Sequence, residues 1–228
     1  MTVSAKVAIV AGAGGALGRA TAMTLAAGGL TVVAVDRTER ALGDLPEGIR
    51  REVADATDPA VATRLIDRIA GEVGPPDVLV NTIGMFRPGD ALGTTPEALR
   101  LMIDVNLGPA LWLSQAVAPH MRQLGSGVIV HVTARPGIEP SGGMTAYSLS
   151  KAALAHLARI LDIELRPHGI RVNAVAPQLL DTAANRATLP AEVMAHAVAP
   201  EAIADAIAYL VSDAAAPVSG AILPAYGT

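Results

Sequence analysis

The sequence predicts a single α/β domain in which a doubly wound parallel sheet of about seven strands carries helices on both faces. Its 228 residues, of which 51% are hydrophobic and 17% charged, suffice for one large buried core. Short apolar runs alternate with amphipathic segments along the chain, which is typical of parallel sheets covered on both sides. Proline and glycine are spread evenly, and no stretch has the composition of a linker. We therefore expect residues 1–228 to form one domain.

Six apolar runs predict strands, and turn residues bound them. In chain order they cover residues 7–11, 31–35, 78–81, 128–133, 170–174 and 221–223. Helical periodicity predicts helices over residues 15–27, 60–72, 97–123, 145–166 and 201–212. Residues 178–199 form the least regular segment, so a lid or substrate loop is expected there.

The composition excludes several classes of function. The absence of cysteine excludes disulfides, thiolate catalysis and cysteine-ligated metal sites. A net charge of −4, one tryptophan, three tyrosines and one phenylalanine provide neither a basic field nor a stacking platform for nucleic acid. Glycines interrupt the first apolar stretch too early for a membrane-spanning helix. We therefore expect a cytoplasmic protein without a membrane or nucleic-acid partner.

The histidines and paired carboxylates predict no metal site. No two histidines lie four residues apart with a carboxylate between them, which is the spacing of a zinc-binding helix. Surface or helix-capping roles are expected for all five histidines, which are His120, His131, His156, His168 and His196. Asp162 and Glu164 are interpreted as solvated carboxylates on an exposed helix face.

A glycine-rich turn joins the first strand to the first helix. It contains Gly12, Gly14, Gly15, Leu17 and Gly18. Glycines there allow the backbone to approach a pyrophosphate, whose negative charge the N–H groups of the helix start favour. This strand–turn–helix context is typical of a Rossmann-type dinucleotide site, although the third glycine comes one residue later than in G-x-G-x-x-G. By itself the pattern is also compatible with a tight turn that binds no ligand.

An acidic residue, Asp36, follows the second predicted strand and lies 18 residues beyond Gly18. A carboxylate at this position can accept hydrogen bonds from the adenosine ribose and would repel a 2′-phosphate. Arg37 has the opposite effect, because a guanidinium could bind that phosphate. On balance the pattern favours NAD(H) over NADP(H) as cofactor.

Tyr147 and Lys151 lie four residues apart at the start of a strong helical pattern, which places them on one helix face. A cation within ~4–6 Å favours the phenolate and can lower a tyrosine pKa by about 1–3 units, toward the range useful for proton transfer. Alone, the pair is equally compatible with a core tyrosine beside a solvated lysine.

These motifs together resemble the short-chain dehydrogenase/reductase family. They comprise the glycine turn, Asp36, residues 53–57, 80–84 and 104–106, the Tyr147/Lys151 pair, and residues 173–182. Their order and spacing follow the family pattern over nearly the whole chain. The resemblance implies an NAD(H)-dependent oxidoreductase that interconverts small carbonyl compounds and alcohols. It also implies a homodimer or homotetramer assembled through the long helices.

The resemblance assigns a role to each matching residue. Tyr147 would be the general acid/base, Lys151 would hold the nicotinamide ribose and lower the tyrosine pKa, and Asn106 would hold a water of the proton relay. The other matches would contact the cofactor: Asp55 and Ala56 at the adenine, Asn81 and Gly84 at the adenosine side, and Pro177 and Thr182 at the nicotinamide end.

Three positions depart from the family pattern. Ala16 replaces a glycine of the turn, which is harmless unless the backbone needs a positive φ, and Gln178 replaces the glycine after Pro177. Ala134 lies thirteen residues before Tyr147, where the family usually has the serine that hydrogen-bonds the substrate carbonyl. Losing one donor to a developing oxyanion typically costs about 3 kcal/mol, or ~10²–10³ in rate.

The missing serine leaves three interpretations open. Another hydroxyl could take its role, such as Ser141 or Thr145, whereas Thr133 should point to the other face of its strand. The acceptor could be an activated one such as a quinone or a quinonoid pterin. The quinonoid dihydropteridine reductases resemble this chain in lacking the serine and in residues 181–190. Finally, the protein could bind a dinucleotide and catalyse little.

Three further side chains are candidates for the substrate pocket. Phe86 and Met144 lie in loops at the carboxyl ends of strands, where parallel sheets bind their ligands. Arg135, next to Ala134, could face the substrate and select an anionic one, although an ordinary loop arginine is the simpler interpretation.

Overall fold

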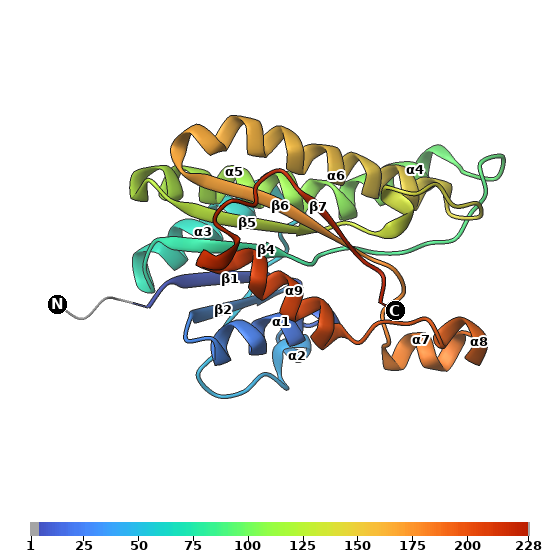
Figure 1. Cartoon of the computed structure of the whole chain (residues 1–228), viewed down its shortest axis with the longest axis horizontal. Coiled ribbons are helices and arrows are strands. Elements are labelled where there is room, and N and C mark those ends of the chain that lie inside the picture. The colour runs from blue at the N-terminus through green and yellow to red at the C-terminus, as the bar shows by residue number, and fades with distance from the viewer. Residues whose placement is uncertain (1–4, 228) are drawn as a thin grey trace.

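The computed structural model describes residues 5–227 and contains a seven-stranded sheet in the order β3-β2-β1-β4-β5-β6-β7. Every neighbouring pair of strands is parallel. The chain winds outward from β1 in one direction and from β4 in the other, so the sheet is doubly wound (Figure 1). The predicted fold class is confirmed.

Six of the seven strands lie close to the predicted apolar runs. The strands are β1 (Val7–Ala11), β2 (Thr31–Asp36), β3 (Arg50–Val53), β4 (Pro76–Asn81), β5 (Gly127–Val132), β6 (Ile170–Pro177) and β7 (Ile222–Ala225). The sequence signal missed β3, whose residues read Arg-Arg-Glu-Val and are alternately half-buried and exposed. This strand pairs with β2 alone at the edge of the sheet, where no continuous apolar run is required.

Helices cover both faces of the sheet, and two apolar clusters mark the two layers (Figure 1). On one face, α3 (Pro59–Glu72), α5 (Gly108–Leu124) and α6 (Thr145–Leu165) bury residues such as Ile66, Leu113 and Leu161. On the other, α1 (Ala16–Ala27), α2 (Glu39–Leu42) and α9 (Pro200–Val211) bury Leu25, Leu42 and Ile207. The carboxyl ends of all strands therefore share one edge between two helical layers.

The segment predicted as one helix over residues 97–123 is two helices, and that prediction was wrong. The first is α4 (Pro96–Asn106), and α5 starts at Gly108 after Leu107. Gly108 and Pro109 follow directly, and proline both lacks a donor N–H and disfavours the helical conformation of the preceding residue. The break leaves Asn106 at the last position of α4.

The irregular segment 178–199 contains two short helices, α7 (Ala183–Thr188) and α8 (Ala191–Met194). Thr182 caps α7 by accepting a hydrogen bond from the backbone N–H of Asn185 at 3.2 Å. A bridge between Leu180 and Val198 joins the two ends of the segment. It is therefore a folded excursion at the carboxyl edge of the sheet, where a substrate loop is expected.

Two polar residues are more buried than the sequence suggests. Asp162 is 2% exposed; Arg166 and the hydroxyl of Ser219 donate to its carboxylate, so the expectation of a solvated carboxylate was wrong. His131 is fully buried inside β5 and has its Nε2 atom 3.1 Å from the Ser114 hydroxyl. A surface or capping role for His131 was therefore also wrong.

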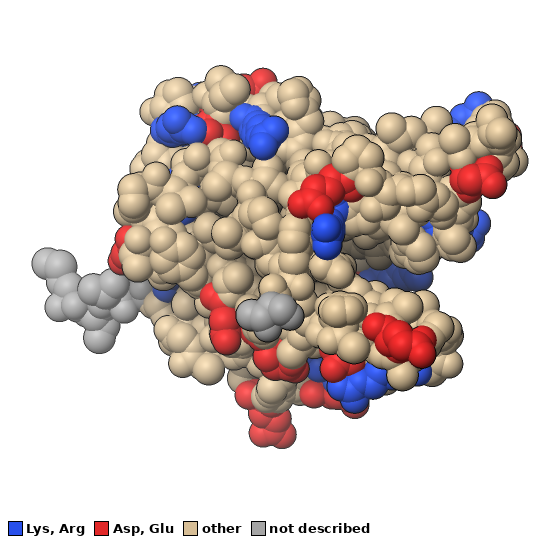
Figure 2. All heavy atoms as spheres, turned by 45° about the vertical axis from the view of Figure 1, so that its right-hand side comes forward, with Lys and Arg blue, Asp and Glu red and all other residues tan. Residues whose placement is uncertain are grey.

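Two remaining expectations concern the surface and the membrane. Figure 2 shows positive and negative side chains interspersed on a mostly uncharged face, with no large basic patch in that view. Within residues 5–227, no helix is both long enough and apolar enough to cross a bilayer. The same residues contain no group of three or more acidic or histidine side chains that could hold a metal ion.

Candidate active site

The glycine turn after β1 is closely packed against the end of β4. Gly12 has φ +82°, a conformation that favours glycine, and a side chain on Gly18 would collide with the carbonyl oxygen of Gly12. Gly15 differs, because a Cβ there would come no nearer than 3.4 Å to that oxygen. Gly15 is exposed and immediately precedes α1. The turn thus presents unobstructed backbone at a helix start, which fits a pyrophosphate.

Two neighbouring residues of the turn have different environments from the glycines. Leu17 is buried in the core cluster, so its side chain faces away from any ligand on the turn. Ala16 is exposed at the first position of α1. No residue other than glycine has a positive φ within residues 5–227, so the methyl group of Ala16 is accommodated without backbone strain.

Asp36 lies beside the turn at the carboxyl end of β2. Its Oδ2 atom accepts a hydrogen bond from the Gly14 N–H at 3.0 Å, and its Oδ1 atom accepts one from the Arg37 N–H at 2.8 Å. A Cβ on Gly14 would lie 2.8 Å from the same Oδ2 atom, so Gly14 allows this approach. The carboxylate is therefore fixed next to the turn, as an adenosine ribose would require.

The residues matched to the adenine end are placed near the same edge. Asp55 is exposed and accepts hydrogen bonds from the N–H and hydroxyl of Thr57, which lower the pKa of the Asp55 carboxyl. Ala56 is 2% exposed and packs into the core, so only its backbone could face a ligand. Asn81 is buried at the end of β4 and accepts a hydrogen bond from the Ile83 N–H at 3.1 Å.

Asn106, Gly84 and Lys151 converge at the end of β4. A Cβ on Gly84 would lie 2.9 Å from both the Asn106 Oδ1 atom and the Lys151 Nζ atom, so these two groups flank the glycine. Asn106 is fully buried; its Oδ1 accepts from the Met85 N–H at 2.8 Å, and its Nδ2 donates to the Met85 carbonyl and the Ser150 hydroxyl, each at 3.0 Å. These bonds fix the loop after β4 against α6.

Lys151 is held inside the protein by the end of β5. Its ammonium donates to the Val132 carbonyl at 2.9 Å, and burial lowers its pKa to about 8. The hydroxyl of Thr133 donates to the Lys151 carbonyl at 2.7 Å. Thr133 is thus occupied in holding α6, consistent with the expectation that it does not replace the serine.

Tyr147 lies one turn before Lys151 on α6. Its ring meets Phe86 edge to face, with 5.1 Å between ring centroids. Phe86, a predicted pocket-wall residue, thus lies against the predicted acid/base. Burial raises the pKa of Tyr147 to about 12. This direction is opposite to the one predicted from the Tyr147/Lys151 spacing. Burial is the cause of the shift, and the Lys151 ammonium directs its hydrogen bond to the Val132 carbonyl.

Sequence reasoning missed Ser150, which links Asn106 to the backbone of Tyr147. Its hydroxyl donates to the Tyr147 carbonyl at 2.7 Å and accepts from the Asn106 side chain at 3.0 Å. The available signal was its position three residues after Tyr147, because residues three and four apart share a helix face.

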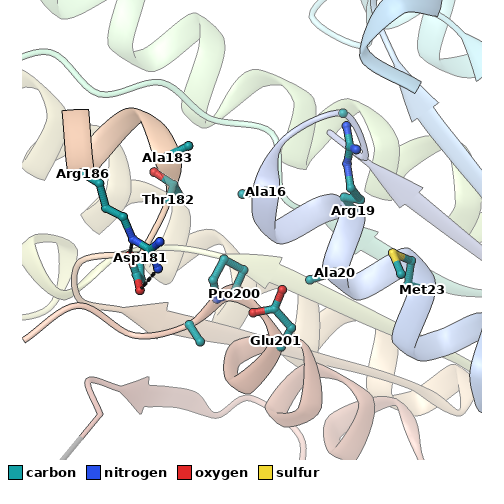
Figure 3. A pocket seen from close by; sticks show the side chains of 12 residues that line it. Ala16, Arg19, Ala20, Met23, Asp181, Thr182, Ala183, Arg186, Pro200 and Glu201 are labelled. Atoms are coloured by element: carbon teal, nitrogen blue, oxygen red, sulfur yellow. Dashed lines mark hydrogen bonds and ion pairs between the residues drawn. The ribbon is translucent and has the colours of Figure 1, made fainter. Parts of the chain in front are cut away.

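A cavity of about 490 Å³ separates the start of α1 from α7 (Figure 3). Gly14 and Ala16 line one side, and Thr182 and Ala183 line the other. Arg186 donates to Asp181 at 2.6 Å on the α7 side. Pro177 ends β6 and is buried, five residues before Thr182. The structure therefore brings Thr182 opposite the glycine turn, where a bound pyrophosphate would lie.

Ala134 follows β5 and is 4% exposed, with no side-chain donor. Arg135 is not a free loop arginine. Its Nε donates to Glu139 at 2.7 Å, its Nη1 donates to the Gln178 Oε1 atom at 2.9 Å, and its guanidinium carbon lies 4.8 Å from the centre of the Tyr226 ring. A polar cluster therefore borders the position of the missing serine.

Comparisons with known proteins show the family to which the chain belongs. The family model for short chain dehydrogenases matches residues 6–193. The cis-4-hydroxycyclohexanecarboxylate dehydrogenase of Sinomonas cyclohexanicum is 38% identical over 97% of this chain and 95% of its own. The galactitol 2-dehydrogenase of Rhizobium johnstonii is 35% identical over 95% and 91%. A solved oxidoreductase of the short chain dehydrogenase/reductase family from Burkholderia thailandensis is 31% identical and has a TM-score of 0.89, covering 97% of this chain and 91% of its own.

Proposed function

Because the chain belongs to the short-chain dehydrogenase/reductase family of oxidoreductases, we propose that it interconverts an alcohol and a carbonyl compound with NAD(H). The observation that carries the proposal is the arrangement of Tyr147, Lys151 and Asn106 around the loop that follows β4. Lys151 and Asn106 flank Gly84, and Tyr147 lies one turn before Lys151 on the same helix. All three side chains thus border the loop that follows β4, at the carboxyl edge of the sheet.

The chemistry divides between cofactor and protein. A bound nicotinamide would supply or accept the hydride. In the reduction direction the Tyr147 hydroxyl, which its raised pKa keeps protonated at neutral pH, donates its proton to the product oxygen. Lys151 would hold the ribose of a bound cofactor and, when charged, would stabilise the phenolate that remains. Asn106 fixes the loop and helix around this proton path through its bonds to Met85 and Ser150.

The acid/base role predicts the effect of Tyr147→Phe. This substitution removes the exchangeable proton and keeps the ring that packs on Phe86. We expect kcat to fall by about 10²–10⁴-fold, with the Kd for NADH changed less than about twofold. The measurement is NADH oxidation with ketones, quinones and pterins, including 4-oxocyclohexanecarboxylate because one relative acts on the corresponding alcohol. Turnover that survives Tyr147→Phe would refute the role of the phenol.

The position of Asp36 predicts the choice of cofactor. Its carboxylate is bonded to the glycine turn and would repel a 2′-phosphate placed at the adenosine ribose. NADH should therefore raise the melting temperature more than NADPH at equal concentration, since stabilisation follows RT ln(1 + [L]/Kd). Asp36→Ala should reduce this preference. Equal stabilisation of the unsubstituted protein by both cofactors would remove Asp36 as the selector.

Ala134 supports a second candidate function, a dinucleotide-binding protein with little catalysis. Assays of NADH oxidation with the same ketones, quinones and pterins distinguish the two functions. A pure binding protein would bind NADH and oxidise none of it. The presence of Tyr147, Lys151 and Asn106 favours the enzyme. Lys151 and Asn106 flank Gly84 in the loop after β4, and Asn106 donates to Ser150 on α6, the helix of Tyr147. Turnover of activated acceptors alone, such as quinones or a quinonoid pterin, would indicate a reductase that needs no serine.

A further inference from the structure

We propose that the carboxamide of Gln178 hydrogen-bonds the reacting substrate oxygen, in place of the serine hydroxyl that Ala134 lacks. The proposal rests on the proposed function, because it concerns the same alcohol–carbonyl reaction. Two departures from the family pattern occur together in this chain: a donor is absent at Ala134, and a donor is present at Gln178 where a glycine is usual. The structure relates these two positions in space.

Gln178 and Ala134 lie on neighbouring strand ends. In the β5–β6 pair, Val132 is level with Val175, and the Thr133 N–H donates to the Val175 carbonyl at 2.9 Å. Continuing this register places Ala134 level with Pro177 and Arg135 level with Gln178. Gln178 therefore lies at the same edge of the sheet as Ala134. It follows the neighbouring strand β6 and is one residue beyond Pro177, the residue level with Ala134.

Arg135 fixes which way the amide of Gln178 faces. A guanidinium has only donors, so the Gln178 atom 2.9 Å from Arg135 must be the oxygen, Oε1. The NH₂ group of Gln178 consequently points away from Arg135. Glu139 and the ring of Tyr226 hold the guanidinium in turn, so Arg135 is a positioning residue for the amide. Among residues 5–227 the hydrogen bond from Arg135 to Oε1 is the only one that the Gln178 side chain makes, so both Nε2 donors are available.

The hydroxyls near Tyr147 are poorly suited to the same task. Thr133 and Ser150 are already bonded to the backbone of Lys151 and Tyr147. Ser141 is exposed in its loop. Thr145 is two residues before Tyr147 on α6, and residues two apart do not share a helix face. Ser148 also has a hydroxyl without a partner in the described part of the chain, but it directly follows Tyr147, and adjacent residues do not share a helix face. Among these donors, Gln178 is therefore the one that is both unbonded and at the end of β6.

In the reaction the amide is a donor and is not consumed. Hydride adds to the carbonyl carbon, the C=O π bond breaks, and the electron pair moves to oxygen. Tyr147 protonates that oxygen, while the Gln178 N–H group stabilises the developing charge and keeps its own proton. Oxidation of the alcohol follows the same path in reverse, with Tyr147 accepting the proton.

The test uses the neutral, similarly shaped substitution Gln178→Met and the substitution Ala134→Ser, alone and combined, in the full-length protein. With the fastest ketone of the panel and NADH, Gln178→Met should lower kcat/KM by about 10²-fold or more, with the Kd for NADH changed less than about twofold. Ala134→Ser should raise kcat/KM at least about tenfold in the Gln178→Met background and change kcat/KM of the unsubstituted enzyme less than about threefold. If Gln178 were merely structural, a hydroxyl at residue 134 would not restore the activity. Gln123→Met, on the exposed end of α5, is the matched control.

Several outcomes would overturn the proposal. Activity of Gln178→Met within about threefold of the unsubstituted enzyme would do so, as would an equal gain from Ala134→Ser in both backgrounds. Should Gln178→Met fail to fold, Gln178→Glu keeps the acceptor for Arg135 and removes both donors, and must show the same loss. If Tyr147→Phe abolishes turnover and Gln178→Met does not, the role of Gln178 is refuted and the proposed function is not. A chain that turns over no ketone of the panel would refute the proposed function and this role with it.

Discussion

At the scale of single residues, burial determines the charge states around the candidate site. Lys151 and His131 are almost or fully inaccessible, and burial lowers the pKa of Lys151 to about 8 and that of His131 to about 4. The Lys151 charge is a second, smaller cause of the His131 shift. The imidazole of His131 in β5 is therefore neutral near pH 7. The next residue of that strand, Val132, accepts the hydrogen bond from the Lys151 ammonium.

The buried imidazole predicts an acid-sensitive stability. The folded pKa of His131, about 4, lies below its ordinary value of 6.5, so the unfolded chain binds this proton first as the pH falls. Above about pH 6.5 the effect is absent, and between pH 6.5 and 4 the free energy of unfolding should fall by up to about 3 kcal/mol. Urea titrations of the wild type and of His131→Asn at several pH values measure the difference. His156→Asn, on an exposed part of α6, is the control, and identical pH dependence in all three proteins would contradict the prediction.

Residue identities could be predicted from the sequence better than residue environments. The motif spacing singled out Asn106, Lys151 and Tyr147, which all border the loop after β4, because positions on one helix face and at strand ends follow from local geometry. The direction of the Tyr147 pKa shift and the burial of His131 and Asp162 could not be predicted, because they depend on chain segments distant in sequence. The contact of Arg135 with Gln178 is of the same kind, since it joins the ends of two strands.

At the scale of elements, apolar periodicity located the strands and helices that have a buried face. It failed for β3, an edge strand with three charged residues, and for the α4–α5 boundary, where both helices continue the same apolar pattern. In the second case Gly108 and Pro109 were the available signal. The 3₁₀ turn Arg135–Gly137, which carries the positioning arginine, has no hydrophobic periodicity and was not predictable in that way.

This turn packs directly on α6, and Gly137 makes the packing possible. A Cβ on Gly137 would lie 2.7 Å from the Lys151 carbonyl carbon and 2.9 Å from its carbonyl oxygen. Gly137→Ala should therefore push the turn off α6, destabilise the fold by about 1–3 kcal/mol and lower activity through the displaced Lys151. Gly142→Ala is the matched control, because a Cβ there would meet nothing within 4 Å. Thermal unfolding and ketone reduction measure the two effects, and equal stability of both variants would refute the packing argument.

At the scale of the whole molecule, the outer face of α6 carries exposed apolar side chains. Helix α6 presents Lys151 and Tyr147 to the sheet edge at its start, while Leu149, Ile160 and Ile163 are 52%, 40% and 72% exposed. Ile160 and Ile163 are three residues apart and share a helix face. An exposed apolar stripe on a helix is typical of an interaction surface, and a second copy of the chain could cover it through a twofold contact.

The stripe predicts a homodimer or homotetramer that a single charge on α6 dissociates. Ile163→Glu would place a carboxylate in the centre of an apolar twofold contact, where each copy brings the same charge against its partner. We expect sedimentation equilibrium to give an oligomer for the unsubstituted chain and a smaller species for Ile163→Glu. Val193→Glu, on the exposed side of α8, introduces the same charge elsewhere and should leave the mass unchanged.

An oligomer that tolerates Ile163→Glu would show that another surface holds it together, and a monomeric wild type would show that the stripe is not a contact between copies.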